Sequence, residues 1–279
     1  MRKGRVSRTA LNVAASMVTL GAKRGWQERL PAGLPELSEA LLLACGAFPF
    51  SPRVLELARR PWAVRLASLG ERLQPGAFEG LGKRKIFMDR QVCAAIDAGA
   101  TQVLVLGAGF DTLCLRLAAE YPRVRFFEID HPDTARAKQR AVKQLGQPDN
   151  VTLLAADLAK KKLSNVLSEC EDWDLSACSA FVAEGLLYYL SPEVVRQLFA
   201  EIHRSCGPGS RVAFSHLFDL HRYALARAAL VVEGEPWLSA SEPDELEDYV
   251  GAGWGIIETQ PDSSVRELEG LAVAKHGGE

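Results

Sequence analysis

The 279-residue sequence lacks several features that define common classes of protein. Its six cysteines stand singly, without a CxxC pair or a histidine at metal-ligand spacing, which argues against a metal site and a disulfide framework. No stretch reaches the roughly 18 apolar residues of a membrane span. The formal net charge is only -2, so no general positive field attracts nucleic acid. These absences predict a cytoplasmic protein with neither a membrane nor a nucleic acid as partner.

The sequence also lacks the third glycine of a dinucleotide fingerprint. Val103–Leu106 is an apolar run too short for a helix, and Gly107 and Gly109 follow it. This pattern predicts a buried parallel strand that ends in a tight turn, where backbone N–H groups can approach a ligand. A pyrophosphate cradle needs a glycine three positions after Gly109, but Thr112 stands there. The turn therefore predicts a nucleotide-type site without a pyrophosphate cradle.

An acidic residue follows the glycines at the distance that a βαβ unit requires. A helical segment ends at Tyr121-Pro122, and a second strand is predicted over Val124–Asp130. Asp130, at the tip of this strand, lies about 20 residues beyond the glycines, where a carboxylate can accept hydrogen bonds from ribose hydroxyls. Glu128 is the alternative if the register of the strand is shifted. The glycines and the delayed acid together favour a nucleoside ligand.

Strands and helices alternate along the rest of the chain, which is typical of a parallel sheet. Further strands are predicted over 151–156, 179–183 and 210–215, and helices over 132–145, 163–170 and 192–205. A helix over 242–250 precedes two strands, 254–259 and 268–274, which are close enough in sequence to form only an antiparallel hairpin. We therefore expect an α/β domain with a doubly wound, mostly parallel seven-stranded sheet.

Residues 1–100 have the pattern of a helical cap over the strand ends. Apolar residues at Leu41-Leu42-Leu43, Val54-Leu55 and Leu66 are expected to pack among prolines. The chain is basic before Glu28, which a transit peptide would explain, but Lys23-Arg24 stands where a small-residue cleavage site is expected. The pattern favours an amphipathic first helix.

Four motifs follow one another at the predicted strand ends. They are Leu106-Gly107-Ala108-Gly109-Phe110-Asp111-Thr112, Phe127-Glu128-Ile129-Asp130-His131-Pro132, Ala156-Asp157-Leu158 and Ala183-Glu184-Gly185-Leu186-Leu187-Tyr188-Tyr189-Leu190. In this order they resemble the leucine carboxyl methyltransferase-like family. The resemblance implies a Rossmann-like class I methyltransferase fold, S-adenosyl-L-methionine as cofactor, and methylation of a carboxylate or hydroxyl on a small molecule or a protein C-terminus. It also implies a helical cap over 1–82, serving as a lid on the acceptor pocket, and a cofactor-binding core over 83–279.

The resemblance implies roles for the residues at the first three motifs. Gly107 and Gly109 would let the backbone meet the methionine moiety of the cofactor, and Asp130 would hold the ribose hydroxyls. Asp157 would accept a hydrogen bond from the adenine amino group, and Leu158 would pack on the ring. Alternatively, Asp157 would be a helix N-cap, because an aspartate at a strand end before a helix is as often a cap as a ligand-binding residue.

Two further residues are assigned to the amino-acid end of the cofactor by the same resemblance. Arg84 would bind the cofactor's carboxylate, for which a planar guanidinium fork is suited, although Lys83 and Lys85 leave the register open. Glu184, at the end of the fourth strand, would bind the amino group.

The acceptor side is predicted to use Tyr189, with Tyr188 as the alternative. A carboxylate acceptor needs no general base, whereas a hydroxyl acceptor would use His216 or His221, which follow the fifth strand. Each histidine is otherwise an ordinary loop residue. Relatives commonly carry arginine directly after the Asp-Thr pair, where Leu113 stands here, so recognition of the acceptor is expected to differ.

Two other functions remain open at this stage. A NAD-dependent oxidoreductase agrees with the acid-tipped second strand but conflicts with Thr112 and with the final hairpin. A non-catalytic domain that keeps the cofactor pocket is the second alternative.

Overall fold

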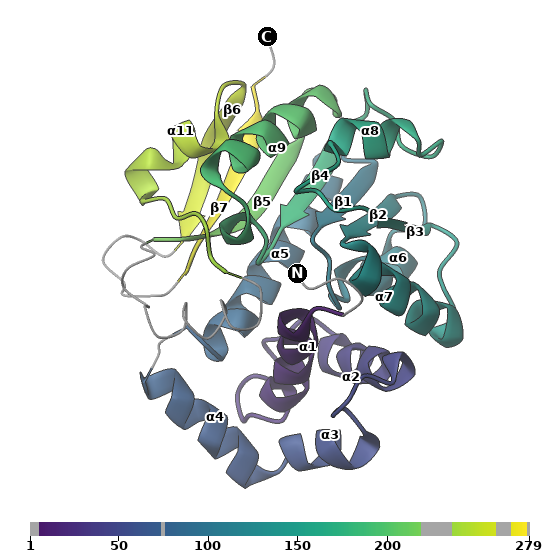
Figure 1. Ribbon diagram of the computed structural model, residues 1–279, viewed down its shortest axis with the longest axis vertical. Coiled ribbons are helices and arrows are strands. Elements are labelled where there is room, and N and C mark those ends of the chain that lie inside the picture. Colours follow the sequence, from purple (N-terminus) through teal and green to yellow (C-terminus); the bar gives the residue numbers. More distant parts are fainter. Residues whose placement is uncertain (1–5, 74–75, 219–235, 261–268, 278–279) are drawn as a thin grey trace.

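The computed structural model describes residues 6–73, 76–218, 236–260 and 269–277. Its centre is a seven-stranded sheet of order β3-β2-β1-β4-β5-β7-β6 (Figure 1). The strands are β1 (Gln102–Leu106), β2 (Arg125–Asp130), β3 (Val151–Ala155), β4 (Ser179–Ala183), β5 (Arg211–Leu217), β6 (Trp254–Gln260) and β7 (Glu269–His276). The first five are parallel, and β7 pairs antiparallel with both β5 and β6. The predicted fold class is confirmed.

Two cores form because successive strand residues point to opposite faces of the sheet. Leu104 and Leu106 face one core, which is closed by α8 (Leu163–Ser168), α9 (Pro192–Arg204) and α11 (Leu246–Val250). Val103 and Val105 face the other core, which is closed by α5 (Glu79–Asp97) and α6 (Leu113–Glu120). The long apolar run that identified β1 is therefore explained by burial on both sides.

Element boundaries differ from the predictions mainly towards the end of the chain. β5 continues to Leu217 and β7 to His276, beyond the predicted limits. The helix predicted over 242–250 consists of a 3-10 turn, Pro243–Glu245, followed by α11. The turn begins at a capping box between Glu242 and Glu245. In contrast, α7 (Pro132–Leu145) starts and ends as predicted.

Four helices precede the core: α1 (Arg8–Gly21), α2 (Leu34–Cys45), α3 (Pro52–Ala58) and α4 (Pro61–Leu73). Figure 1 shows them at one end of the sheet. The apolar stripe of α1 is buried, as expected of an amphipathic helix, with Leu11, Met17 and Val18 at its centre. Within the described residues, no helix is both long and apolar enough to cross a membrane.

The predicted packing of the cap is only partly correct. Leu41, Leu42 and Leu55 are buried, but Leu43, Val54 and Leu66 are 36%, 37% and 64% exposed. A helix turns about 100° per residue, so consecutive apolar residues cannot all face one core. The predicted boundary between residues 82 and 83 lies within α5, and the division into cap and core stays a prediction.

Candidate active site

One cavity of about 920 Å³ lies where the carboxyl ends of β1, β2 and β4 meet α1. Its wall contains eight of the nine predicted site residues: Arg84, Gly107, Gly109, Asp130, Asp157, Leu158, Glu184 and Tyr189. Ligands of open α/β sheets bind at this edge, beyond the carboxyl ends of the strands. The cavity is therefore the candidate active site.

The glycine turn after β1 needs residues without a side chain. Gly107 and Gly109 have φ values of +64° and +51°, which L side chains rarely adopt. A Cβ atom on Gly107 would lie 2.9 Å from Leu186 Cδ1, and one on Gly109 would lie 2.9 Å from Ala10 Cβ. The absence of both Cβ atoms leaves the backbone open to the cavity and lets α1 close over it.

The carboxylate of Asp130 holds this turn in place. Its Oδ2 accepts a hydrogen bond from the Gly109 N–H at 2.5 Å, and its Oδ1 accepts one from the His131 N–H at 2.6 Å. Burial raises the pKa of Asp130 despite these two donors. A carboxylate has about four lone-pair sites, so further donors such as ribose hydroxyls can still be accepted.

Glu128, the alternative acid, belongs to the interior rather than to the cavity. It is 2% exposed and lies 2.5 Å from Lys138 Nζ, which also donates a hydrogen bond to the Asp111 carbonyl oxygen at 2.6 Å. Burial raises the pKa of Glu128 although Lys138 opposes the shift. The strand register thus brings Asp130, not Glu128, to the site.

Asp157 and His131 stand together at the β2–β3 side of the cavity. The Asp157 Oδ1 accepts a hydrogen bond from the Ala159 N–H at 3.2 Å, and its other oxygen pairs with Lys160. His131 caps α7, with Nδ1 accepting from the Asp133 N–H at 3.4 Å. Asp157 thus orders a turn and is not a helix N-cap, since α8 begins only at Leu163, and both side chains line the cavity.

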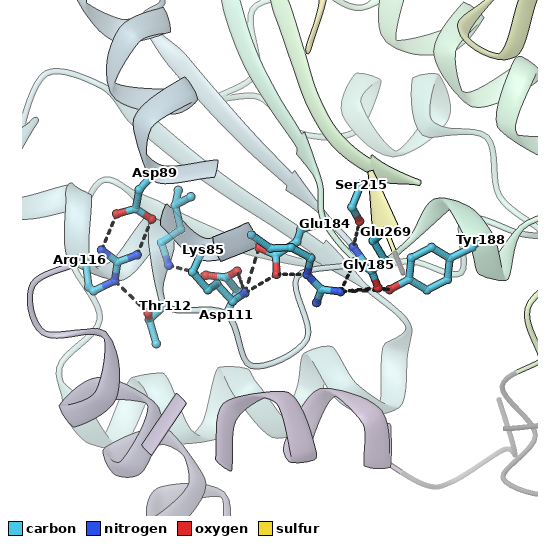
Figure 2. A network of polar contacts seen from close by, with 12 residues as sticks. Lys85, Asp89, Asp111, Thr112, Arg116, Glu184, Gly185, Tyr188, Ser215 and Glu269 are labelled. Carbon is cyan, nitrogen blue, oxygen red and sulfur yellow. Dashed lines mark hydrogen bonds and ion pairs between the residues drawn. The ribbon is translucent and has the colours of Figure 1, made fainter. Parts of the chain in front are cut away.

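A dense ion-pair network forms the opposite wall (Figure 2). Arg84 Nε donates to Glu184 Oε1 at 3.2 Å, and its Nη1 lies 2.8 and 2.6 Å from the two carboxylate oxygens of Glu269. Lys85 Nζ donates to Asp111 and, at 3.1 Å, to Glu184. Of the three residues in the basic run, Lys83 is exposed, whereas Arg84 and Lys85 are buried and line the cavity.

The network keeps Asp111 and Arg84 ionised although they are buried. Burial alone would raise the pKa of Asp111, but the ammonium groups of Lys85 and Lys138 hold it well below its usual value. Burial would lower the pKa of Arg84, but Glu269, Tyr188 and Glu184 raise it well above its usual value. Each charge is thus maintained by its neighbours.

Lys85, Asp111 and Glu269 were not assigned by sequence reasoning. Lys85 stood in the basic run, and Asp111 directly followed the glycine turn, so both had a local signal. Glu269 had none, because its partner Arg84 lies 185 residues away in sequence.

The two tyrosines after β4 both line the cavity but differ in role. The Tyr188 hydroxyl accepts a hydrogen bond from Arg84 Nη1 at 3.3 Å and donates one to Glu269 Oε1 at 3.1 Å. Burial raises the pKa of Tyr188 well above its usual value, so the hydroxyl stays protonated. Tyr189 is only partly buried, and its ring centroid lies 4.9 Å from that of Tyr188.

His216, predicted as a catalytic base, does not reach the described wall of the cavity. It is 2% exposed, its Nδ1 lies 2.9 Å from the Ser241 carbonyl oxygen, and burial lowers its pKa to about 4. The expectation that His216 follows the fifth strand is wrong, because β5 continues through Leu217 and keeps His216 inside the sheet. His221, its alternative, lies outside the described residues.

Leu113, which stands where relatives commonly carry arginine, does not face the cavity. Leu113 is buried in the core, and Arg116 forms two 2.7 Å hydrogen bonds to Asp89 and one of 2.9 Å to Thr112 Oγ1. Arg116 therefore joins α5 to α6 beneath the glycine turn rather than facing a ligand.

The fold and the site together define a class I methyltransferase. Its marks are the antiparallel β7 inserted between β5 and β6, and a glycine turn and strand-tip acid that face one cavity. The described chain resembles a crystal structure of a candidate methyltransferase from Thermobifida fusca YX, with a TM-score of 0.59 and 20% identity over 88% of this chain and 99% of that one. It also resembles a DUF574 family protein from Streptomyces avermitilis MA-4680, with a TM-score of 0.58 and 16% identity over 90% of this chain and 98% of that one. At these identities the likeness concerns the fold alone.

The sequence comparisons give the family. The model of the leucine carboxyl methyltransferase family matches residues 51–203, and the chain belongs to this family. Candidate S-adenosyl-L-methionine-dependent methyltransferases are among its relatives. One from Mycobacterium avium (strain 104) is 26% identical and aligns over 90% of this chain and 86% of its own length. One from Mycobacterium ulcerans (strain Agy99) is 28% identical and aligns over 95% of this chain and 90% of its own length. The protein is an S-adenosylmethionine-dependent methyltransferase, and the oxidoreductase alternative is set aside.

The residues of the cavity fit S-adenosylmethionine chemically. The glycine turn presents its backbone to the cavity, and Asp130 retains acceptor capacity for a diol. Arg84 and Glu184 offer opposite charges for a carboxylate and an ammonium group. When bound, the cofactor supplies an electrophilic methyl group on a sulfonium sulfur.

Proposed function

We propose that the protein transfers a methyl group from S-adenosylmethionine to an oxygen atom of a small molecule bound in the same cavity. The observation that carries the proposal is the extent of the cavity. Its volume of about 920 Å³ lies near the upper end of the range for ligand pockets, and its wall runs from Leu158 to Trp237. It therefore has room for an acceptor beside the cofactor.

In this proposal the cofactor spans the cavity along the strand ends. Asp157 and Leu158 contact the adenine, Asp130 the ribose, and the backbone at Gly107 and Gly109 the methionine chain. Arg84 and Glu184 bind the carboxylate and the amino group. The acceptor then lies beyond the network, beside Tyr188, Tyr189 and Trp237, all of which line the cavity.

The protein's contribution to the reaction is alignment and exclusion of water. A methyl group on a sulfonium is already activated, so an acceptor oxygen held behind it in line with the C–S bond needs little further help. Ala10, Val13 and Met17 of α1 line the cavity, which supports the prediction that residues 1–82 form its lid.

The experiment is transfer of a labelled methyl group. The purified chain is incubated with S-adenosylmethionine labelled in the methyl group and with the small-molecule fraction of a cell extract. A labelled product that depends on the enzyme and is lost with Gly109→Val supports the proposal. Tight cofactor binding without any transfer to small molecules would instead favour a protein C-terminus as acceptor or a non-catalytic cofactor-binding domain. A parallel reaction with the protein fraction separates these two.

A further inference from the structure

The charges of the cavity restrict the chemistry of the acceptor. Its described wall contains more carboxylates than cations: Asp111, Asp130, Asp157, Glu184 and Glu269 against Arg84, Lys85 and Lys160. The bound cofactor would bring one carboxylate and two positive groups. One positive charge is thus added, and the carboxylates still outnumber the cations.

Each cation of the described wall is already paired. Arg84 contacts Glu184 and Glu269, Lys85 contacts Asp111 and Glu184, and Lys160 contacts Asp157. We assign the cofactor's own carboxylate to Arg84, so a carboxylate acceptor would be a second anion in a cavity where negative charge is already in excess. Like charges brought together in a buried site strongly disfavour binding. A neutral acceptor avoids this cost.

The acceptor end of the cavity is also lined by aromatic side chains. Trp237 is 6% exposed, and its Nε1–H has no hydrogen-bond partner within the described residues. Its ring lies edge-on to Tyr188, with centroids 5.8 Å apart. Because aromatic side chains line this end of the cavity, it suits an acceptor with an apolar body.

Glu269 is the most accessible of the three acids that pair with Arg84 and Lys85. Its side chain is 13% exposed, compared with 4% for Glu184 and 6% for Asp111. It stands at the start of β7 beside the Tyr188 hydroxyl, as Figure 2 shows. A carboxylate at this position can receive a proton from the acceptor.

We infer that the acceptor is an uncharged hydroxyl compound with an apolar body and that Glu269 takes up its proton. The inference rests on the proposed function and departs from the carboxylate chemistry that the name of the family describes. The acceptor oxygen forms the O–CH3 bond, the C–S bond breaks with its electron pair remaining on sulfur, and the hydroxyl proton passes to the Glu269 carboxylate. An ionised carboxylate suffices as base because the hydroxyl becomes strongly acidic once the C–O bond forms.

The stability of the product to alkali tests the inference. Methyl esters release methanol in mild base, whereas methyl ethers do not. We expect the labelled product to survive alkali and to be identified by mass spectrometry as an ether. A base-labile ester or an N-methyl product would overturn the inference. An ester would leave the proposed O-methylation standing, while an absence of any transfer would count against the proposed function itself.

Variants of Glu269 add a second arm. Glu269→Gln should slow hydroxyl methylation by about a hundredfold, the usual scale for a general base, while Glu269→Asp should retain part of the activity. The matched control is Glu258→Gln, because Glu258 of β6 also pairs with an arginine of α5 but lies outside the described wall of the cavity. An unchanged rate in Glu269→Gln, with correct folding shown by its thermal transition, would exclude Glu269 as the base.

Direct binding gives a readout that does not depend on turnover. Benzyl alcohol and benzoate share a ring and differ in charge, and their binding can be measured by NMR titration in the presence of S-adenosylhomocysteine. We expect benzyl alcohol to bind at least about tenfold more tightly than benzoate, and Glu269→Gln to narrow the difference. Equal or tighter binding of benzoate to the unaltered protein would overturn the inference.

Discussion

The two ends of the cavity are built in different ways. At the β2–β3 end, single carboxylates accept hydrogen bonds from backbone N–H groups, as in the contacts of Asp130 with Gly109 and His131. At the β4–β7 end, Arg84, Glu184 and Glu269 come from three distant segments and hold one another by charge. The first end therefore depends on backbone conformation, and the second depends on a balance of buried charges.

The largest expected effect comes from removing the central cation of the charged end. Arg84→Ala would leave Glu184 and Glu269 without their shared guanidinium, and breaking a buried ion pair costs about 3–5 kcal/mol. We expect this loss in urea unfolding, together with loss of cofactor binding. Arg90→Ala is the control, because Arg90 lies on the same helix and pairs with Glu258 at the surface. Equal stability of the two variants would refute the importance of the charge balance.

The second prediction breaks the backbone end. Gly109→Val adds a branched side chain at a φ of +51° and against Ala10, which should destabilise the closed turn by about 2–5 kcal/mol. Calorimetry should then detect no binding of S-adenosylhomocysteine. Gly146→Val is the control, since its φ is also positive at +91° but nothing lies within 4 Å of an added Cβ. Normal binding by Gly109→Val would contradict the role of the turn.

The third prediction concerns His216, which is buried in β5. Burial lowers the pKa of His216 from 6.5 to about 4, so the neutral ring contributes stability that is complete above pH 6.5 and is lost as the pH falls through about 4. The loss should amount to about 3 kcal/mol at 1.36 kcal/mol per pKa unit. Unfolding experiments between pH 7 and 4 should therefore show a steeper decline for the unaltered protein than for His216→Phe. Parallel declines would mean that folding does not lower the pKa of His216.

The smallest expected effect is at the strand-tip acid. Asp130→Ala should weaken cofactor binding by about 1–3 kcal/mol, the scale for hydrogen bonds to a charged acceptor. We expect Asp130→Asn to fall between this variant and the unaltered protein, because an amide oxygen can still accept from Gly109. Asp172→Ala, at an exposed surface pair with Arg125, serves as the control in the same titration. Binding that is unaffected by Asp130→Ala would remove Asp130 from the cofactor site.

The comparison also explains what could be predicted from the sequence. The strands β1 and β4 and the helix α7 were predicted correctly because buried apolar runs and helix caps are local signals. The spacing of a βαβ unit also predicted that Asp130 and the glycine turn lie near each other, and both line the cavity. These features lie in consecutive segments, so pattern and spacing were sufficient.

The rest depends on contacts that no local pattern encodes. Glu269 meets Arg84 only because β7 is inserted beside β5, and His216 is buried only because β5 runs two residues further than predicted. Leu66 is apolar and was expected to pack in the cap, yet it is exposed. Its helix, α4, contributes no buried residue among those described. Strand pairing between segments far apart in the sequence therefore explains both why Glu269 was missed and why His216 was misplaced.

The most direct test compares two ligands that differ only at the charged end. S-adenosylhomocysteine carries the amino-acid moiety on its sulfur, whereas 5′-methylthioadenosine carries only a methyl group there. Calorimetry with Arg84→Lys should show binding of S-adenosylhomocysteine weakened by at least about tenfold, since a point charge replaces a planar fork, with 5′-methylthioadenosine affected less than about twofold. An equal loss for both ligands, or no loss for either, would contradict the assignment of the two ends.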